Sequence, residues 1–423
     1  MESETGADSE RDQPIQAPVA ADNRIQSLDI LRGFALCGVL VMNMQAFADV
    51  FAVYINPYAT GEISRLDYLC WCFNHVVADA KFITIFSMLF GAGIALMTSR
   101  AKERTGRSTG LHYRRMFWML LFGLAHVCLL WNGDILFLYG SVGLIAFWFR
   151  GVRPSIQISI AIFLFLIPPV FLSTLQMVPE NELAEMREMW SPSQETVESI
   201  RASMLGSWLQ TAEFRIGEWA EMLTFLLVFG WRLLGCMLLG MALYTTRVLS
   251  AARSMRFYSI MVFIGFGVGL PLSTYGVVKF QTQAWEMVYS MGVGSLFNYF
   301  GSLFTAIGWI GVVMVIVRAG FMRKLQRRFA AVGRLALSNY IMQSLICTTI
   351  YNGHGLGFFG SVDRIWQQVL SLAIISLQLW YSPIWLRSFR FGPLEWLWRS
   401  LTYWRRQPFR LAAAGGVQSE SNP

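Results

Sequence analysis

The sequence is dominated by long apolar stretches, and these place the chain in a membrane. Hydrophobic residues make up 55% of its 423 residues and charged residues only 14%, a composition outside the usual range of soluble domains. A helix needs about 20 apolar residues to cross the hydrocarbon of a bilayer. Spans of roughly this length are predicted at residues 30–50, 82–98, 116–131, 135–149, 155–176, 222–245, 257–278, 297–317, 335–351 and 366–386. We therefore expect an all-α, polytopic transmembrane helical bundle of about ten spans.

The distribution of positive charge predicts the orientation of this bundle. If the segment before the first span is cytoplasmic, 26 of the 34 lysines and arginines fall on the cytoplasmic side. Cationic loops stay in the cytoplasm because their translocation is disfavoured. Both termini are therefore expected there, and the net charge of +8 belongs to the membrane surface rather than to a nucleic-acid site.

Changes in composition divide the chain into four parts. Residues 1–24 are too polar to fold alone and predict a disordered cytoplasmic tail. A membrane half over 25–220 precedes a second membrane domain over 221–405, and 406–423 form another cytoplasmic tail. The first half ends in a polar insertion, 178–221, expected as amphipathic helices on the outer side. Two interpretations of the insertion stay open: a cap over an outer cavity, or a solvated linker.

A cationic group is predicted where the first and third spans begin. Asp29 and Arg32 are three residues apart and share a helical face, and Gly33 lets a neighbouring backbone approach. One interpretation is an ion pair that anchors the helix. The other combines Arg32 with Arg114 and Arg115 in a cytosolic pocket for a phosphorylated ligand.

The short third and fourth spans place a histidine and a carboxylate near a recessed turn. His126 comes shortly before the WNGD turn, which ends in Asp134. Histidine is the side chain best suited to proton transfer near neutral pH. The alternatives are a histidine satisfied by a carbonyl and an aspartate that caps the fourth helix. His75 and His354 are competing candidates for an outer base.

Further polar side chains lie within the expected spans, where they need partners or water. Arg232 is near the middle of the sixth span, and Asn43 is on the first. Asn339 and Gln343 are four residues apart on the ninth span and share a face. They predict either hydrogen bonds between helices or the lining of a pathway.

Other common site motifs receive no support. Cys70 and Cys72 form a lone Cys-x-Cys without a second ligand pair, so no metal site is predicted. The chain contains no glycine-rich phosphate loop or serine nucleophile elbow between a strand and a helix.

Five segments carry a resemblance to a known family. They are RIQSLDILRGFALCGVLVMN at 24–43, DAKFITIFSMLFGAG at 79–93, RRMFWMLLFGLAHVCLLWNGDILFLYG at 114–140, GRLALSNYIMQS at 333–344 and FGPLEWLWRSLTYW at 391–404. Together they resemble the YeiB-like family of bacterial inner-membrane proteins, whose C-terminal half is a domain of unknown function. The resemblance implies a multi-pass protein of the bacterial inner membrane.

The N-terminal half is also similar, through LDILRG and the histidine-bearing hairpin, to transmembrane acyltransferases of the heparan-alpha-glucosaminide acetyltransferase type. The resemblance implies that His126 is a general base or transient acyl carrier, oriented by Asp134. It implies that Arg32, Arg114 and Arg115 bind the donor. Acyl-CoA would then be a co-substrate, with no bound cofactor, and the acceptor would be periplasmic or lipid-linked.

A transporter or flippase for an anionic solute or lipid is the alternative, with Arg232, Asn339 and Gln343 along its pathway. An inverted repeat would favour transport, yet no copy of LDILRG follows residue 220. The sequence therefore favours the enzyme. It leaves the acceptor, the acyl chain and the oligomeric state open, a homo-oligomer included.

Overall fold

The computed structural model describes residues 25–106 and 108–411, and every regular element in these ranges is a helix. The expected tail over 1–24 and most of the one over 406–423 lie outside the described residues. The long helices are α1 (Gln26–Ala48), α4 (Lys81–Thr105), α5 (Thr109–Leu129), α7 (Pro154–Thr174), α11 (Trp219–Thr245), α12 (Met255–Thr282), α14 (Ser295–Ala319) and α17 (Arg364–Ser388). The shorter ones are α2 (Ala52–Ile55), α3 (Arg65–Val77), α6 (Leu136–Ala146), η2 (Phe147–Phe149), η3 (Leu175–Met177), η4 (Glu180–Glu182), α8 (Ala184–Trp190), α9 (Gln194–Leu205), α10 (Trp208–Gly217), α13 (Met287–Tyr289), η5 (Ser290–Gly294), α15 (Arg323–Arg334), α16 (Ala336–Tyr351) and α18 (Pro393–Tyr403).

The expected class, an all-α polytopic membrane bundle, is confirmed. Within the described residues, 7 helical segments are long and apolar enough to cross a membrane. The other three predicted spans coincide with α5, with α6 and η2, and with α16. Of these, α6 has 11 residues and α16 has 16, which is short for a full crossing. The total of ten spans therefore stays a prediction.

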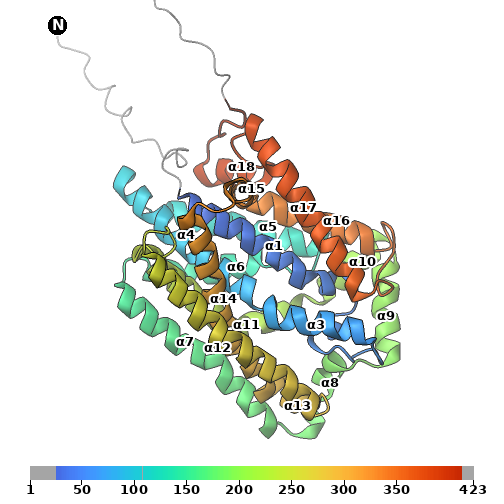
Figure 1. Ribbon diagram of the computed structural model, residues 1–423. Helices are drawn as coiled ribbons and strands as arrows, with labels where there is room; N and C mark the ends of the chain where they lie inside the picture. The colour runs from blue at the N-terminus through green and yellow to red at the C-terminus, as the bar shows by residue number, and fades with distance from the viewer. Residues whose placement is uncertain (1–24, 107, 412–423) are drawn as a thin grey trace, which may run out of the picture.

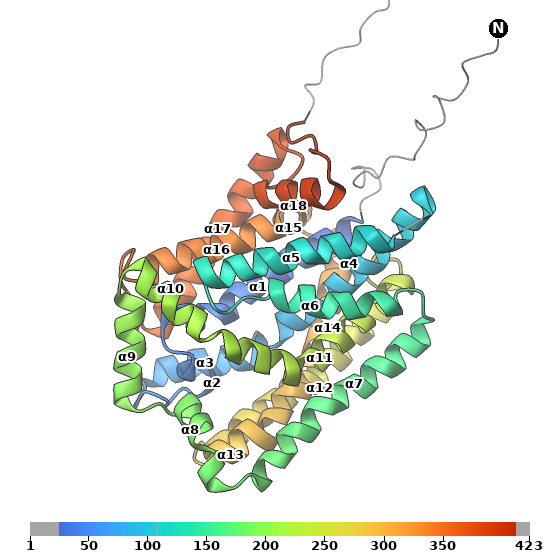
Figure 2. The ribbon, with the colours of Figure 1, turned by 180° about the vertical axis from the view of Figure 1, so that it is seen from behind.

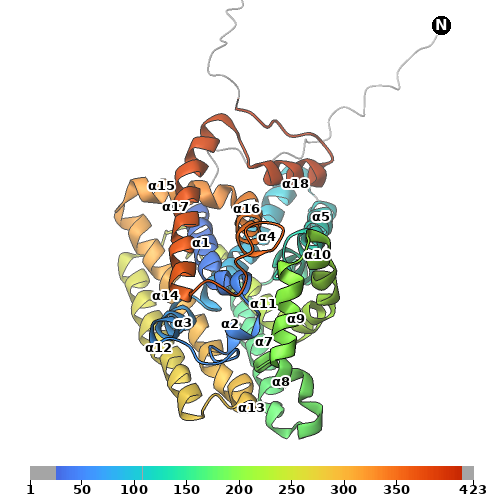
Figure 3. The same cartoon turned by 90° about the vertical axis from the view of Figure 1, so that its right-hand side faces the viewer.

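The bundle has two distinct ends. We call the end where α1 begins the basic end, because the arginine-rich α15 lies there, together with α18. We call the opposite end the insertion end, because α8, α9 and α10 lie there (Figures 1 and 3). The first residues of α5 are at the basic end and its last residues are near the insertion end. Side chains on α5 therefore lie at both ends of the bundle.

Close backbone packing holds α1 at the centre of the bundle, where it contacts α4, α14, α15, α16 and α17. A Cβ atom at Gly33 would collide with the carbonyl oxygen of Phe329 and the amide of Gly333. The predicted close approach at Gly33 is thus confirmed, and its partner is the backbone of α15. Apolar side chains from α1, α4, α6 and α11 fill the space around this contact.

Helices α12 and α14 also meet through small residues. A Cβ atom at Gly265 would collide with Gly308, and one at Gly269 would collide with Thr305 and the carbonyl oxygen of Gly301. Such close contacts are how helices associate in a bilayer, where lipid is as apolar as a leucine side chain.

The insertion packs against the end of the bundle. The side chain of Asn56, after α2, donates a hydrogen bond to the carbonyl oxygen of Trp190, at 3.1 Å. Arg201 on α9 forms an ion pair with Asp49, which follows α1, at 3.2 Å. The insertion also contributes Val197 to an apolar cluster with the end of α1. These contacts make α8–α10 a cover over this end (Figure 2).

Candidate functional site

The structure joins the predicted histidine and carboxylate to a serine from a distant helix. The Nδ1 atom of His126 lies 2.9 Å from Oδ1 of Asp134, and its Nε2 atom lies 2.8 Å from Oγ of Ser344. The three residues are at most 2% exposed. A carboxylate on one imidazole nitrogen and a hydroxyl on the other is the arrangement that activates a hydroxyl as a nucleophile.

The hairpin between α5 and α6 fixes this geometry. The second carboxylate oxygen of Asp134, Oδ2, accepts a hydrogen bond of 2.6 Å from the backbone amide of Phe137. Gly123 on α5 allows the start of α6 to approach, because a Cβ atom there would collide with the amide of Phe137. Asp134 lies one residue before the N-cap of α6, Ile135, and uses different oxygens to bind the first turn of this helix and His126.

Helix α16 presents two polar faces to different neighbours. Tyr340 and Ser344, four residues apart, face the hairpin, and the Tyr340 ring centroid is 5.1 Å from that of His126. Asn339 and Gln343 instead face α17, where Gln343 donates to the Gln378 side chain at 2.9 Å. Gln378 in turn donates to the carbonyl oxygen of Asn339 at 2.9 Å. Asn339 and Gln343 thus link two helices, as one of the two interpretations predicts.

Sequence reasoning did not assign a role to Ser344, although the residue lies next to Gln343. The available signal is its spacing of four from Tyr340, which defines a second polar face on an otherwise apolar helix. Serine alone is too common in membrane helices to be singled out, and the partner of this face lies far away in the sequence.

Helix α10 covers the end of α5 beside this group. The indole of Trp208 donates to the carbonyl oxygen of Leu129 at 3.1 Å, and Arg215 donates to that of Cys128 at 3.2 Å. Burial lowers the pKa of Arg215 to about 10. Helix α10 is thus bound to α5 within one turn of His126.

The other two candidate histidines lie outside this group. His75 on α3 has its Nδ1 atom 3.3 Å from Oδ2 of Asp79, and its ring stacks on Trp71 at 4.7 Å. His354 is exposed in the loop after α16, where partial desolvation and the charge of Arg215 lower its pKa. Among the described residues, neither of these two histidines contacts a serine hydroxyl.

The three arginines of the predicted donor pocket lie at the basic end. Arg32 pairs with Asp29 at 2.9 Å, as expected from their spacing. Arg115 lies close enough to Arg32 for the charges to interact. The guanidinium of Arg115 lies 4.5 Å from the ring centroid of Trp398 on α18, and that of Arg114 lies 4.7 Å from that of Trp404.

Helix α18 is anchored by a buried carboxylate. Glu395 accepts hydrogen bonds from the amide of Ser338, at 2.9 Å, and from its hydroxyl, at 2.5 Å. The indole of Trp398 donates to the carbonyl oxygen of Arg115 at 3.1 Å. Glu395 thus fixes the helix that contacts Arg115 and that leads into Trp404, the partner of Arg114.

Arg232 occupies a separate network in the bundle interior. Its guanidinium donates to the carbonyl oxygen of Tyr299 at 2.9 Å and to the hydroxyls of Ser302, at 2.7 Å, and Thr84, at 3.0 Å. These partners are on α14 and α4, whereas Asn339 and Gln343 bind α17. The structure therefore does not bring these three predicted pathway residues together. Asn43 is half-buried on α1.

Comparison with known proteins matches both halves of the chain. A family model described as "Protein of unknown function (DUF418)" matches residues 243–405. The chain is 30% identical over 404 residues to "Uncharacterized protein YeiB" of Escherichia coli (strain K12), which covers 94% of this chain and 98% of that protein. It is 29% identical over 414 residues to "Uncharacterized protein YxaH" of Bacillus subtilis (strain 168), with 92% and 97% covered. No solved structure matches.

Proposed function

The chain belongs to the YeiB-like family, and from that premise we propose that it is a transmembrane acyltransferase of the bacterial inner membrane. The acyl group passes from an acyl-CoA at the basic end to an acceptor at the insertion end. The observation that carries the proposal is the contact of His126 with both Asp134 and Ser344 in a buried site. A relay of this kind serves acyl transfer on several unrelated folds.

Each of the three residues has a defined role in the proposed reaction. Asp134 holds the proton on Nδ1 of His126 and stabilises the imidazolium when it forms. His126 accepts the proton of Ser344 through Nε2 as Oγ attacks the thioester carbonyl carbon. The carbon–sulfur bond breaks, and the same proton leaves with the thiolate as free CoA thiol.

A second step completes the transfer. An acceptor hydroxyl or amine gives its proton to Nε2 of His126 and attacks the acyl carbon on Ser344. The bond from the acyl carbon to Oγ breaks, and His126 returns a proton to the serine. General base catalysis of this kind contributes on the order of 10² to 10⁴ in rate.

The basic end suits the phosphates of the donor. Arg32, Arg114 and Arg115 supply fixed positive charge, and guanidinium groups bind phosphate through paired hydrogen bonds. Trp398 and Trp404 hold two of these groups in place. Since Arg115 and His126 are 11 positions apart on α5, the donor site and the reaction site lie about 16 Å apart along the axis. A thioester on a long flexible arm can bridge such a separation.

Access to the buried relay depends on the cover at the insertion end. Ser344 is 0% exposed, so the acceptor reaches it only when neighbouring helices move. Helix α10 is the element suited to this motion, because single hydrogen bonds from Trp208 and Arg215 join it to α5. We place this end on the periplasmic side, in accordance with the excess of positive charge at the other end.

Release of free thiol from acetyl-CoA tests the proposal. The full-length protein in nanodiscs is incubated with acetyl-CoA, and thiol is followed over time for the unaltered protein and for His126→Gln. Because no acceptor is added, the thiol measured is that of the first step, the acylation of Ser344; the variant should lose this release and retain donor affinity. His112→Gln is the matched control, since His112 lies on the same helix and is 0% exposed. Its Nε2 atom lies 3.0 Å from the carbonyl oxygen of Gly143, and its ring stacks on that of Phe147. Equal thiol release by His126→Gln and the unaltered protein would contradict the proposal.

A further inference from the structure

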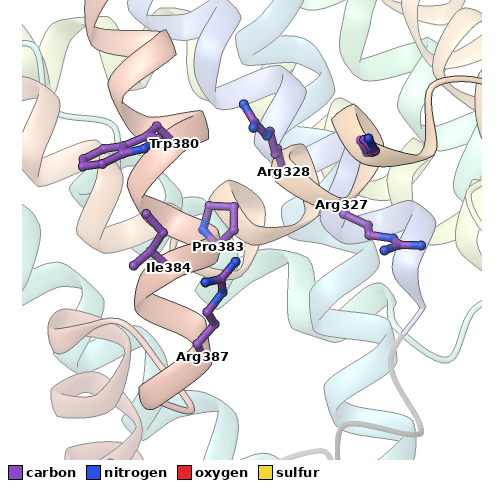
Figure 4. A pocket seen from close by; sticks show the side chains of 7 residues that line it. Arg327, Arg328, Trp380, Pro383, Ile384 and Arg387 are labelled. Atoms are coloured by element: carbon purple, nitrogen blue, oxygen red, sulfur yellow. The ribbon is translucent and has the colours of Figure 1, made fainter.

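A pocket at the basic end lies between α15 and α17, away from the site described above. Its volume is about 360 Å³. Figure 4 shows Trp380, Ile384 and Arg387 following one another along α17, with Arg327 and Arg328 on the neighbouring helix α15. The lining residues are Lys324, Arg327, Arg328, Trp380, Pro383, Ile384 and Arg387.

One half of the pocket is a concentration of positive charge. Lys324, Arg327 and Arg328 share a face of α15 because they are three and four residues apart, and Arg387 completes the group from α17. The pocket lining contains no carboxylate. Within the described residues, none of these four cations forms a salt bridge. Four unpaired cations around one cavity attract a group with negative charge.

The other half is apolar and continues onto a membrane-spanning surface. Trp380 is 60% exposed and Ile384 is 44% exposed. Both are on α17, one of the helical segments long and apolar enough to cross the membrane. Tryptophan is enriched where the hydrocarbon meets the headgroups of a bilayer. The apolar half therefore offers a surface for a hydrocarbon chain beside the cations.

We propose that this pocket binds an anionic phospholipid. The phosphate is held by the four cations, and an acyl chain lies along Trp380 and Ile384. A soluble phosphate compound would use only the cationic half and would leave the two large apolar side chains exposed. Basic pockets between helices at the membrane surface are the usual sites for anionic headgroups. This site does not depend on the proposed acyl transfer.

Lipid titration with detection by native mass spectrometry tests the assignment. The full-length protein is titrated with phosphatidylglycerol, and separately with phosphatidylcholine, in detergent micelles. Arg327→Gln combined with Arg328→Gln removes two pocket cations. Arg247→Gln combined with Arg256→Gln is the matched control, since both residues are exposed, lie at the same end and are outside the pocket.

The pocket variant should bind phosphatidylglycerol about 30-fold more weakly, because it lacks two cations that each contribute about 1 kcal/mol to binding. The affinity of the control variant should be unchanged. Phosphatidylcholine should bind weakly to all three proteins, and glycerol phosphate should fail to displace phosphatidylglycerol. Thermal unfolding of both variants checks that each is folded. Equal affinities of the pocket variant and the control would overturn the proposal. Displacement by glycerol phosphate would also overturn it, by showing a site for free phosphate.

Discussion

The Nε2 atom of His126 lies 2.8 Å from the Oγ atom of Ser344, although 218 positions separate the two residues in the sequence. With Asp134 on the other ring nitrogen, this contact turns a buried histidine into a relay that can activate a hydroxyl. Asn339, Gln343 and Arg232 in the same bundle are satisfied by neighbouring helices, so they need no chemical role. Within residues 25–106 and 108–411, a histidine placed between a carboxylate and a hydroxyl is found at the His126 group.

Asp134→Asn should separate the role of Asp134 in the relay from its role in the fold. The amide oxygen can still accept the hydrogen bond from the amide of Phe137, so the hairpin should remain folded. The carboxylate that fixes the His126 tautomer is lost, and thiol release from acetyl-CoA should fall about 10²- to 10⁴-fold. Turnover at the original rate, in a protein with unchanged thermal unfolding, would argue against the relay.

Gly33→Ala should destabilise the bundle at its centre. The added Cβ atom would meet the backbone of Phe329 and Gly333, which cannot move aside as a flexible side chain would. A loss of about 1–3 kcal/mol in the free energy of unfolding is expected from such overpacking, measured by thermal unfolding in detergent. Gly93→Ala on α4 is the control, because a Cβ atom there meets nothing within 4 Å. Equal stability of the two variants would contradict the close packing of α1 and α15.

Glu395→Ala should weaken donor binding from a distance. Its carboxylate holds α18 to Ser338. Helix α18 carries Trp398, which contacts Arg115, and ends just before Trp404, which contacts Arg114. Calorimetry with acetyl-CoA should show a lower affinity, whereas Leu397→Ala, which changes an exposed residue of the same helix, should not. If the two variants bind the donor equally well, α18 does not position the arginines.

The same carboxyl group predicts a pH dependence of stability. Burial raises the pKa of Glu395 above its usual value of 4.5. A group whose pKa is raised by folding stabilises the folded state when protonated, and this contribution is lost as the pH rises through the raised pKa. Thermal unfolding between pH 4 and pH 8 should therefore show the unaltered protein losing stability relative to Glu395→Gln as the pH increases. A constant difference between the two proteins would contradict this assignment.

Arg232→Ala distinguishes the enzyme from a transporter. The guanidinium donates to Tyr299, Ser302 and Thr84, and losing hydrogen bonds from a charged group should cost about 3 kcal/mol of stability or more. Below the unfolding temperature, thiol release should persist. Anion flux in proteoliposomes that disappears in this variant, but not in His126→Ala, would support transport instead.

Local sequence relationships predicted the parts of the site that lie within one helix or hairpin. The pairing of Asp29 with Arg32 follows from a spacing of three residues, and that of His126 with Asp134 follows from a short hairpin. The close approach at Gly33 was predicted for a similar reason, because a missing side chain on a central helix leaves room for another backbone. The helical class followed from the apolar stretches alone.

The remaining features depend on packing between distant segments. Ser344 joins His126 only because α16 lies beside the hairpin, and nothing near the serine in sequence indicates this. The hydrogen-bonding partners of Arg232 come from α4 and α14, so its burial could be predicted but its neighbours could not. The docking of α8–α10 likewise rests on tertiary contacts such as that of Arg201 with Asp49.

The most direct test is to detect the acyl group on Ser344. The full-length protein is incubated with acetyl-CoA labelled in the acetyl group, quenched in acid, and mapped by peptide mass spectrometry, beside Ser344→Ala and a control Ser371→Ala. Ser371 is equally buried and donates only to the carbonyl oxygen of Gln367. We predict label on the peptide containing Ser344 in the unaltered protein and in Ser371→Ala, and none in Ser344→Ala. Thiol release at the normal rate by Ser344→Ala would contradict the account.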